Sequence, residues 1–378
     1  MKLKSLNLKN FRNYSVASLI LSPNVNIFIG DNGSGKTNIL EAIYVLSLTK
    51  SSRYGTEVDL IKNGESGLNI MGEVEKEDYI KKYEVKIDKF AKRVFINNTQ
   101  IKKISSYISE FCITSFLPND IEIIKGSPSI RRNLLNIQIG MLYNNYLKFV
   151  NEYNSLLRIR NDYLKRLSIN SFSDGKYLDI INDKMIDLSV KIYYFRFFYL
   201  SEINKILPDV FKKISGVENV KVGYQNSLNI EYFDENKIRE IMQKKYKNNL
   251  NKEIMQGVTI TGLHRDDLVF FLNDLDAKIY ASQGQQRLLV IAYKISELLL
   301  FKKIKNDYPV LLLDDVFSEI DSKKRNKIVK FFKDDIQVII TTTDIEDINE
   351  KIVEKAKVFF IKNGEIKIKG GAKCKRKK

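Results

Sequence analysis

The sequence predicts an α/β nucleotide-binding fold with a mainly helical lobe inserted into it. Three observations lead to this prediction. Apolar residues 27–29 run into a glycine-rich loop and then into an amphipathic helical pattern. A second apolar run, residues 309–313, ends in two adjacent aspartates. Between these segments, apolar residues recur every three to four positions from about residue 141, which is the period of an α-helix.

The glycine-rich loop has the spacing of a phosphate-binding P-loop. It reads Gly30-Asp31-Asn32-Gly33-Ser34-Gly35-Lys36-Thr37, and Asn38 continues into the helical run. Glycines let the backbone approach a phosphate without a Cβ in the way, and amides at a helix N-terminus point at the anion. We expect Lys36 to reach the β- and γ-phosphates and the Thr37 hydroxyl to bind Mg²⁺. The alternative is a chance match to the motif. The predicted strand before the loop and the predicted helix after it argue against chance.

Two alternating segments, residues 3–8 and 16–21, precede the loop strand and predict two further strands. Asn10-Phe11-Arg12-Asn13-Tyr14 lies between them. Arg12 and Asn13 are therefore candidate nucleotide contacts close to the phosphate loop, although both are also ordinary turn residues.

A second candidate anion site opens the helix predicted for residues 288–301. Ser282-Gln283-Gly284-Gln285 places a hydroxyl, a glycine and free amides at that helix N-terminus. Taken alone, such a segment is more often only a helix cap. Upstream of it, residues 268–272 and 277–280 have the character of strands.

The two aspartates follow a buried, parallel-type strand, Val310 to Leu313. The carboxyl ends of such strands face the nucleotide crevice in open α/β sheets. Asp314 is expected to hold Mg²⁺ through water, and Asp315 to orient and deprotonate the attacking water. A simple strand-terminal turn would predict one aspartate rather than a pair. Asp321 follows at the start of another helix, and residues 338–344 form a further buried strand that ends in hydroxyls.

The order of these segments predicts two lobes. Residues 1–140 and 263–378 form the nucleotide-binding lobe, and residues 141–262 form the helical insertion. The aromatic and aliphatic stripe of the insertion is typical of a packed core rather than of a ligand site. Residues 370–378 form a basic tail that we expect to be disordered.

Composition indicates a polyanionic partner and argues against a membrane. The net charge of +17 favours nucleic acid, although a lysine-rich, AT-rich coding bias contributes to it. The richest apolar stretch, residues 193–200, is too short to span a bilayer, and Met1 to Lys4 show no signal-peptide pattern. We therefore expect a cytoplasmic protein. Its 2 cysteines cannot form a metal site.

The order of P-loop, Ser-Gln-Gly-Gln, strand-Asp-Asp and Ser-Glu-Ile-Asp resembles the ATPase heads of the ABC superfamily. The likeness to the RecF family of bacterial recombination mediators is closer still. It depends on five segments. Two departures from the usual family pattern matter, Leu263 before His264 and Ile320 before Asp321, and neither touches a group expected to take part in the chemistry. The segments are residues 10–14, 128–132, His264-Arg265-Asp266-Asp267-Leu268, 282–287 and 313–319.

This resemblance implies an ATP-dependent, DNA-binding homodimer of recombinational repair and replication restart. It would help RecO and RecR load RecA onto gapped DNA, with ss/ds junctions and duplexes as further DNA forms, and would hydrolyse ATP weakly with stimulation by DNA. By the same resemblance, the P-loop of one subunit binds ATP and Mg²⁺, while Ser282 and Gly284 of the other contact the γ-phosphate. Gln283, Gln285 and Asp321 belong to the same predicted nucleotide-binding set.

Turnover is expected to be slow, because Asp315 stands where transporter ATPases usually place the longer Glu. Two rival classes fit less well. A transporter ATPase usually carries Leu-Ser-Gly-Gly-Gln and a strand-end histidine, and an SMC-type protein needs a far longer coiled coil. His264 is the only histidine, and a loop residue satisfied by Asp266 or Asp267 is favoured over a role in chemistry.

Overall fold

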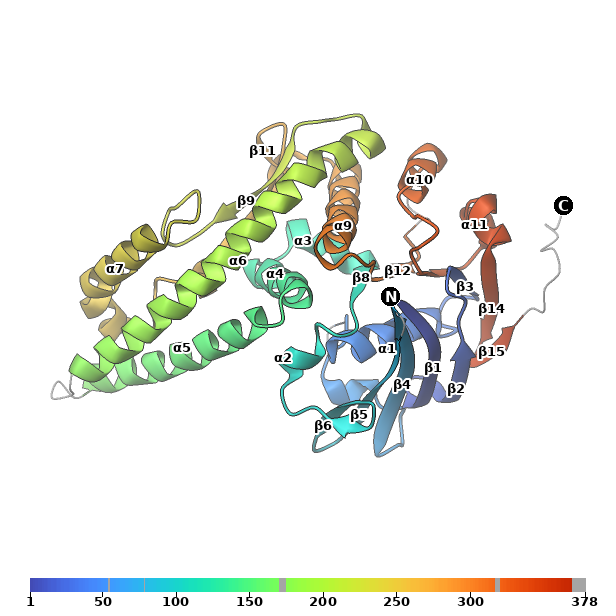
Figure 1. The fold of residues 1–378 in the computed structure, drawn as a ribbon, viewed down its shortest axis with the longest axis horizontal. Coiled ribbons are helices and arrows are strands. Elements are labelled where there is room, and N and C mark those ends of the chain that lie inside the picture. The colour runs from blue at the N-terminus through green and yellow to red at the C-terminus, as the bar shows by residue number, and fades with distance from the viewer. Residues whose placement is uncertain (54, 78, 170–174, 317–319, 369–378) are drawn as a thin grey trace. The chain divides into compact units, whose positions relative to one another are not determined.

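Three β-sheets and two groups of helices make up the computed structural model, which describes residues 1–53, 55–77, 79–169, 175–316 and 320–368 (Figure 1). The chain divides into two compact units. The first consists of residues 1–120 and 297–378, and the second of residues 121–296. The predicted basic tail, residues 370–378, lies outside the described residues.

The first sheet of unit 1 is antiparallel, with the strand order β2-β1-β4-β5-β6-β7. Its long strands alternate between buried and exposed side chains, as a sheet with one covered face requires. The two predicted N-terminal strands are confirmed as β1 and β2. The strands are β1 (Lys2–Phe11), β2 (Tyr14–Ile20), β4 (Gly67–Lys76), β5 (Tyr79–Asp88), β6 (Lys92–Ile96) and β7 (Thr99–Gln100).

The second sheet has the order β15-β14-β3-β13-β12-β8, and all its strands are parallel except β15. Every residue of β12 and β13 is buried, which explains why these strands are continuous apolar runs rather than alternating ones. Their carboxyl ends lie at one edge of the sheet. The strands are β3 (Val25–Ile29), β8 (Ile113–Phe116), β12 (Val310–Asp314), β13 (Val338–Thr342), β14 (Ala356–Lys362) and β15 (Glu365–Ile368).

Helix α1 (Lys36–Leu48) contacts strands of both sheets of unit 1. It is buried on nearly all sides, and Ile39, Ile43 and Leu46 are inaccessible to solvent. This central position fixes the helix N-terminus, and with it the P-loop, at the carboxyl edge of the parallel sheet. Shorter helices complete the unit: α2 (Ile104–Tyr107), α10 (Ser322–Val329) and α11 (Glu350–Glu354).

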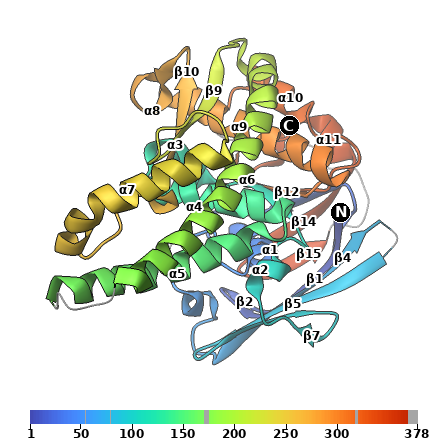
Figure 2. The same ribbon diagram turned by 60° about the vertical axis from the view of Figure 1, so that its left-hand side comes forward.

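Unit 2 is built on three long helices, α5 (Tyr146–Ile169), α6 (Gly175–Ser215) and α7 (Glu235–Gln256), which contact one another (Figure 2). A fully buried ion pair joins Arg160 of α5 to Glu253 of α7 at 2.7 Å, and the Asn182 amide oxygen of α6 accepts from the same guanidinium. The other elements are α3 (Glu122–Lys125), α4 (Pro128–Leu142), β9 (Val220–Gln225), β10 (Asp267–Leu272), β11 (Leu275–Asp276), α8 (Ala277–Tyr280) and the first part of α9 (Gln283–Lys305).

The unit boundaries fall at residues 120 and 296 rather than at the expected 140 and 262. Helix α4 contacts α5, α6 and β10, so residues 121–140 pack with the helical group although their sequence pattern resembles the residues before them. The strand prediction for residues 277–280 was wrong. These residues form α8, because the Asp276 carboxylate accepts from the Lys278 amide and caps a helical turn. None of the described helices has the length and apolarity needed to cross a membrane.

Candidate nucleotide-binding site

The P-loop connects β3 to α1 and needs glycine at two positions. Gly33 and Gly35 have φ angles of 79° and 115°, a region that L side chains rarely adopt. A Cβ on Gly35 would also lie 2.6 Å from the Asn13 amide nitrogen and 2.8 Å from the Tyr14 hydroxyl. Gly33 has open space around it. The loop is therefore packed against residues 13 and 14 on one side and accessible on the other.

Lys36 places its ammonium inside this loop. Its Nζ donates to the carbonyl oxygens of Gly30 at 2.6 Å and Asp31 at 2.9 Å, and the residue is only 7% exposed. Burial lowers the pKa of Lys36, and the carboxylates of Asp315, Asp314 and Asp31 oppose that effect. Because the Lys36 ammonium is shielded from water, an anion placed beside it would strongly stabilise its charged form.

Thr37, Asp314 and Thr341 form a hydrogen-bonded group at the ends of α1, β12 and β13. The Thr37 hydroxyl donates to Asp314 Oδ1 at 2.9 Å, and the Thr341 hydroxyl donates to the same oxygen at 2.6 Å. Asp314 is 4% exposed. The register of β12 against β13 pairs Asp314 with Thr341, so the contact is a consequence of strand alignment.

A cavity of about 280 Å³ opens beside this group. It brings together a hydroxyl, a carboxylate, an amide and a guanidinium, which come from segments far apart in sequence. Arg53 and Asn119 also line the cavity, and the sequence analysis did not predict them as site residues. The signal that the sequence offers for them is their position just after a predicted apolar helix or strand. The lining residues are Thr37, Ser52, Arg53, Leu117, Pro118, Asn119 and Asp314.

Asn13 supports the loop from behind. Its amide nitrogen donates to the Ser34 carbonyl at 3.1 Å, and its oxygen accepts from the Asn38 amide at 2.8 Å. Tyr14 donates to the Gly35 carbonyl at 3.0 Å. The hydroxyl of Ser34 is buried and has no hydrogen-bond partner among the described residues, which is costly unless a ligand supplies one. Asn13 and Asn38 thus support the loop, and the Ser34 hydroxyl can still form a hydrogen bond with a ligand.

Arg12 contacts helix α1. Its guanidinium makes a two-pronged pair with the buried Glu41 carboxylate, at 2.9 and 2.7 Å, and donates to the Asp59 carbonyl at 2.8 Å. Arg53 lies 3.8 Å from the same carboxylate and donates to the Asn38 side chain at 3.2 Å. Glu41 therefore holds two arginines beside the loop, and Arg53 is the one that reaches the cavity.

Asp315 follows β12 in a left-handed conformation, with φ at 51°. Its amide donates to the Thr341 carbonyl at 3.2 Å, so the hydrogen bonding between β12 and β13 extends one residue past the end of β12. Aspartate tolerates this conformation better than most residues. Asp321 caps helix α10, because its carboxylate accepts from the Lys324 amide at 2.9 Å. The Ser318 and Glu319 of the same predicted motif lie outside the described residues.

The Ser282 segment belongs to unit 2 and begins helix α9. The Ser282 hydroxyl accepts from the Gln285 amide at 3.3 Å, and the Gln285 side chain accepts from the Ser282 amide at 2.8 Å. This reciprocal pair is a capping box. Gln283, Gly284 and Gln285 are exposed, and Gly284 has open space where a Cβ would be. The helix N-terminus is thus presented to solvent.

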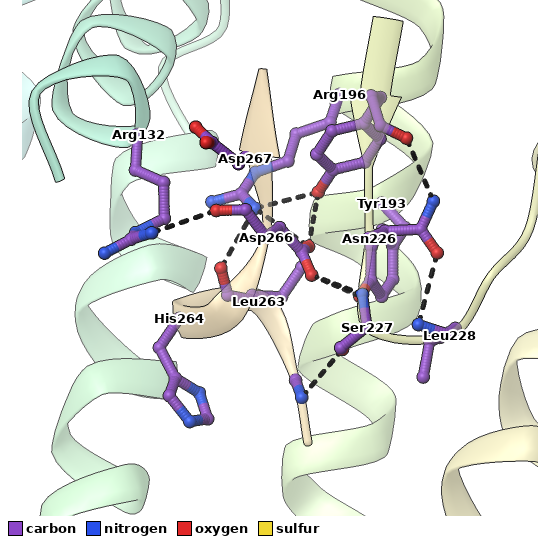
Figure 3. Close-up of polar contacts among 12 residues, drawn as sticks. Arg132, Tyr193, Arg196, Asn226, Ser227, Leu228, Leu263, His264, Asp266 and Asp267 are labelled. Atoms are coloured by element: carbon purple, nitrogen blue, oxygen red, sulfur yellow. Dashed lines mark hydrogen bonds and ion pairs between the residues drawn. The ribbon is translucent and has the colours of Figure 1, made fainter. Parts of the chain in front are cut away.

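The pair of aspartates that follows His264 and Arg265 has a structural role. Asp266 is fully buried and accepts from the Tyr224 hydroxyl at 2.6 Å and the Ser227 amide at 2.9 Å, with Arg196 at 3.4 Å (Figure 3). Burial raises the pKa of Asp266, and these donors oppose the rise. Asp267 makes a two-pronged pair with Arg131, at 2.7 Å for each contact. These contacts join β9, β10, α4 and α6.

His264 does not contact either aspartate through a hydrogen bond, so the expected partners were wrong. Its ring is turned away from Asp266 in Figure 3. Its Nε2 donates to the Thr259 carbonyl at 2.9 Å, which leaves Nδ1 to accept from the Tyr153 hydroxyl at 3.1 Å. Burial lowers the pKa of His264 to about 4. The imidazole is neutral at physiological pH and ties the 259–264 segment to α5.

Comparisons with known proteins extend over nearly the whole chain. The family described as RecF/RecN/SMC N terminal domain matches residues 2–367. A "DNA replication and repair protein RecF" from Lactobacillus johnsonii is 37% identical over 98% of this chain and 100% of its own. This chain belongs to the RecF family. A structure of the recombination mediator protein RecF with ATP, from the RecFOR pathway, is similar to this chain with a TM-score of 0.90, 31% identity and 98% coverage of both chains. A second RecF structure gives a TM-score of 0.88 at 30% identity, covering 97% of both.

Membership of the RecF family confirms the predicted fold class, an ABC-type ATPase head with an inserted lobe. It also explains why a P-loop unit and a Ser-Gln-Gly-Gln helix occur in one chain. Among the described residues, no group of three or more His, Cys, Asp or Glu side chains could hold a metal by itself. The hydroxyl and carboxylate of Thr37 and Asp314 suit Mg²⁺, which usually takes few protein ligands together with waters and substrate phosphates.

Proposed function

We propose that this chain is an ATP-dependent DNA-binding protein of recombinational repair and replication restart. It acts as a homodimer, hydrolyses ATP slowly, and helps RecO and RecR load RecA at gapped DNA. The observation that carries the proposal is the arrangement of the P-loop, Lys36 and the hydrogen-bonded Thr37–Asp314 pair at one edge of the parallel sheet. The ATP-bound RecF relatives support the same assignment.

In this proposal the residues of the P-loop take the phosphates of ATP. The amides of residues 33–37 point at the anion, and the Ser34 hydroxyl gains the partner that it lacks. Lys36 exchanges its contacts with two loop carbonyls for phosphate oxygens. Thr37 and Asp314 would hold Mg²⁺, which would supply positive charge against the charge that develops on the phosphates.

Asp315 orients and deprotonates the water that attacks the γ-phosphate. Its left-handed backbone turns the side chain away from the direction that a continuing strand would give it. An aspartate is also one methylene shorter than glutamate, so placement of the water is less favourable. Hydrolysis is therefore slow, and ATP serves mainly to hold the protein on DNA until it is hydrolysed.

Dimerisation completes the site. Each chain has a P-loop in unit 1, and the N-terminus of α9, at Ser282 to Gln285, is exposed in unit 2. In the homodimer the α9 N-terminus of one chain contacts the γ-phosphate bound to the other, across a two-fold axis. ADP lacks that phosphate, so ATP favours the dimer and ADP does not.

Binding to DNA is largely independent of base sequence. The net charge of +17 favours contacts between lysines and phosphates, which carry little sequence information and weaken as salt rises.

The test is binding to a gapped duplex with ATP, with ADP and without nucleotide, at two salt concentrations. Wild type should bind tightly only with ATP, and Lys36→Ala should bind equally weakly in all three states. Lys9→Ala, which removes the same charge from the exposed face of β1, serves as the control and should behave as wild type. DNA affinity that is the same with and without nucleotide would contradict the proposal.

A further inference from the structure

Helix α6 exposes large aromatic side chains midway along its length. Tyr194 is 50% and Phe198 is 41% exposed, although the helical period of this segment predicted a packed core. Their neighbours Tyr193 and Tyr199 are buried as predicted. The exposed rings belong to a contiguous set that we call the aromatic patch: Tyr143, Phe149, Tyr194, Phe195, Phe198 and Phe233.

Ring contacts connect every member of the aromatic patch. Phe195 contacts Tyr143 and Phe149, with centroids 4.9 and 6.5 Å apart. Tyr194 contacts Phe233 at 5.4 Å and lies nearly parallel to Phe198, at an interplanar angle of 21° and 6.4 Å between centroids. The two most exposed rings are thus held by their neighbours in similar orientations, with part of each ring open to solvent.

A contiguous exposed apolar surface of this kind usually marks a binding site. The three neighbouring rings that are partly covered, Tyr143, Phe195 and Phe233, already fix the orientation of Tyr194 and Phe198. The contacts of Tyr194 and Phe198 with these rings stabilise the fold, and they leave about half of the Tyr194 side chain and two fifths of Phe198 open to solvent.

The charges around the aromatic patch favour an anionic partner. Lys191 lies over the Phe149 ring at 5.3 Å, and Lys237 over the neighbouring Tyr232 ring at 5.7 Å. Among the described residues, Lys148, Lys191 and Lys237 have no carboxylate within salt-bridge distance.

The carboxylates on the same elements are mostly engaged. Glu202 is 7% exposed and pairs with Lys205. Asp187 and Glu235 both pair with Arg239, and Asp234 caps α7 by accepting from the Lys237 amide. Glu152 and Glu231 are exposed carboxylates in the same segments.

We propose that the aromatic patch binds the unpaired bases of single-stranded DNA, which stack on Tyr194 and Phe198 while Lys148 and Lys191 face the phosphates. Every base has a flat π-surface, so this mode is tolerant of sequence and combines aromatic side chains with basic ones. The inference rests on the proposed DNA-binding function and specifies its substrate: the single-stranded part of a gapped molecule. A protein partner would also use aromatics, but the lysines favour nucleic acid.

The first experiment compares three probes of equal length: a thymidine oligonucleotide, its abasic analogue with the same phosphates, and a duplex. With ATP present, we expect wild type to bind the thymidine strand about tenfold or more tightly than the abasic strand, because stacking needs the bases. Tyr194→Ala and Phe198→Ala should each lose about tenfold on the thymidine strand and change little on the abasic strand or duplex. Tyr177→Ala is the matched control, since Tyr177 is 46% exposed near the start of the same helix.

The second experiment reports on the stack directly. The chain has no tryptophan, so Tyr194→Trp introduces a single indole that can be excited selectively. The thymidine strand should quench this fluorescence, and the abasic strand and duplex should not. A Tyr177→Trp variant should show no quenching by any probe.

The outcomes separate this inference from the proposed function. If wild type with ATP binds no DNA, the proposed function fails. If it binds the duplex, but binds thymidine and abasic strands equally and the indole is not quenched, only the inference is overturned. Variants that keep full single-strand affinity but lose self-association in sedimentation would assign the patch to a second copy of the chain, which also overturns it.

Discussion

Acidification should leave His264 uncharged well below the pH at which an exposed histidine titrates. Burial, together with the positive charges of Arg265, Arg132 and Arg160, lowers its pKa to about 4 from an ordinary value of about 6.5, and the hydrogen bond to the Thr259 carbonyl opposes part of that effect. Because the unfolded chain binds this proton first, the free energy of unfolding falls as the pH drops from about 6.5 towards 4. The difference between these two pKa values predicts a loss of about 2 kcal/mol by pH 5.

The chain has a single histidine, which makes the measurement direct. Proton NMR of the imidazole should give one titrating signal with a midpoint near pH 4 while the protein is folded. Urea unfolding at pH 7.5 and pH 5 should show wild type losing about 2 kcal/mol more than His264→Gln, whose amide can still donate and accept but does not titrate. A midpoint near 6.5 would refute the reasoning, because the ring would then be exchanging its proton with solvent freely.

Further predictions concern the nucleotide site. Asp315→Asn should lower ATP hydrolysis by about a hundredfold or more and leave ATP-dependent DNA binding intact; loss of both would contradict a role limited to the attacking water. Lys36→Ala and Ser282→Arg should each abolish hydrolysis, and mixing them should restore part of it, because one composite site in each heterodimer is intact. No recovery, with heterodimers shown to form, would favour a site complete in one chain or strict coupling of both. Gly35→Ala should destabilise unit 1 by about 3 kcal/mol and weaken ATP binding, whereas Gly33→Ala, which meets no atom, should cost about 1 kcal/mol. Equal thermal shifts for the two would refute the packing argument.

The sequence was sufficient for features that depend on short-range spacing. The P-loop is a local motif whose glycines, lysine and threonine act through the backbone that joins them, so its position could be read directly. The same is true of the buried run that ends at Asp314, because a strand covered on both faces must be continuously apolar. Long strands and helices were also predictable, since their hydrophobic period repeats over several turns or residues.

Sequence patterns predicted the wrong structure where a single local contact or a packing contact outweighed the hydrophobic periodicity. Residues 277–280 alternate like a strand, yet the capping carboxylate of Asp276 makes them a helical turn. The unit boundary moved for a similar reason: α4 lacks the long aromatic pattern of the insertion, but its packing against α5 and β10 assigns it there.

Only the tertiary structure decided which groups meet. Nothing local to Arg12 indicates that it pairs with Glu41, and nothing near His264 indicates Tyr153 as its partner. The same holds for α6, where Tyr193 and Tyr194 are adjacent and chemically identical. One is buried and the other exposed, because successive helix positions point about 100° apart and only the neighbouring elements determine which direction is covered. The residues of the phosphate loop are set by sequence spacing, whereas the choice between core and surface is made by packing between segments far apart in the chain.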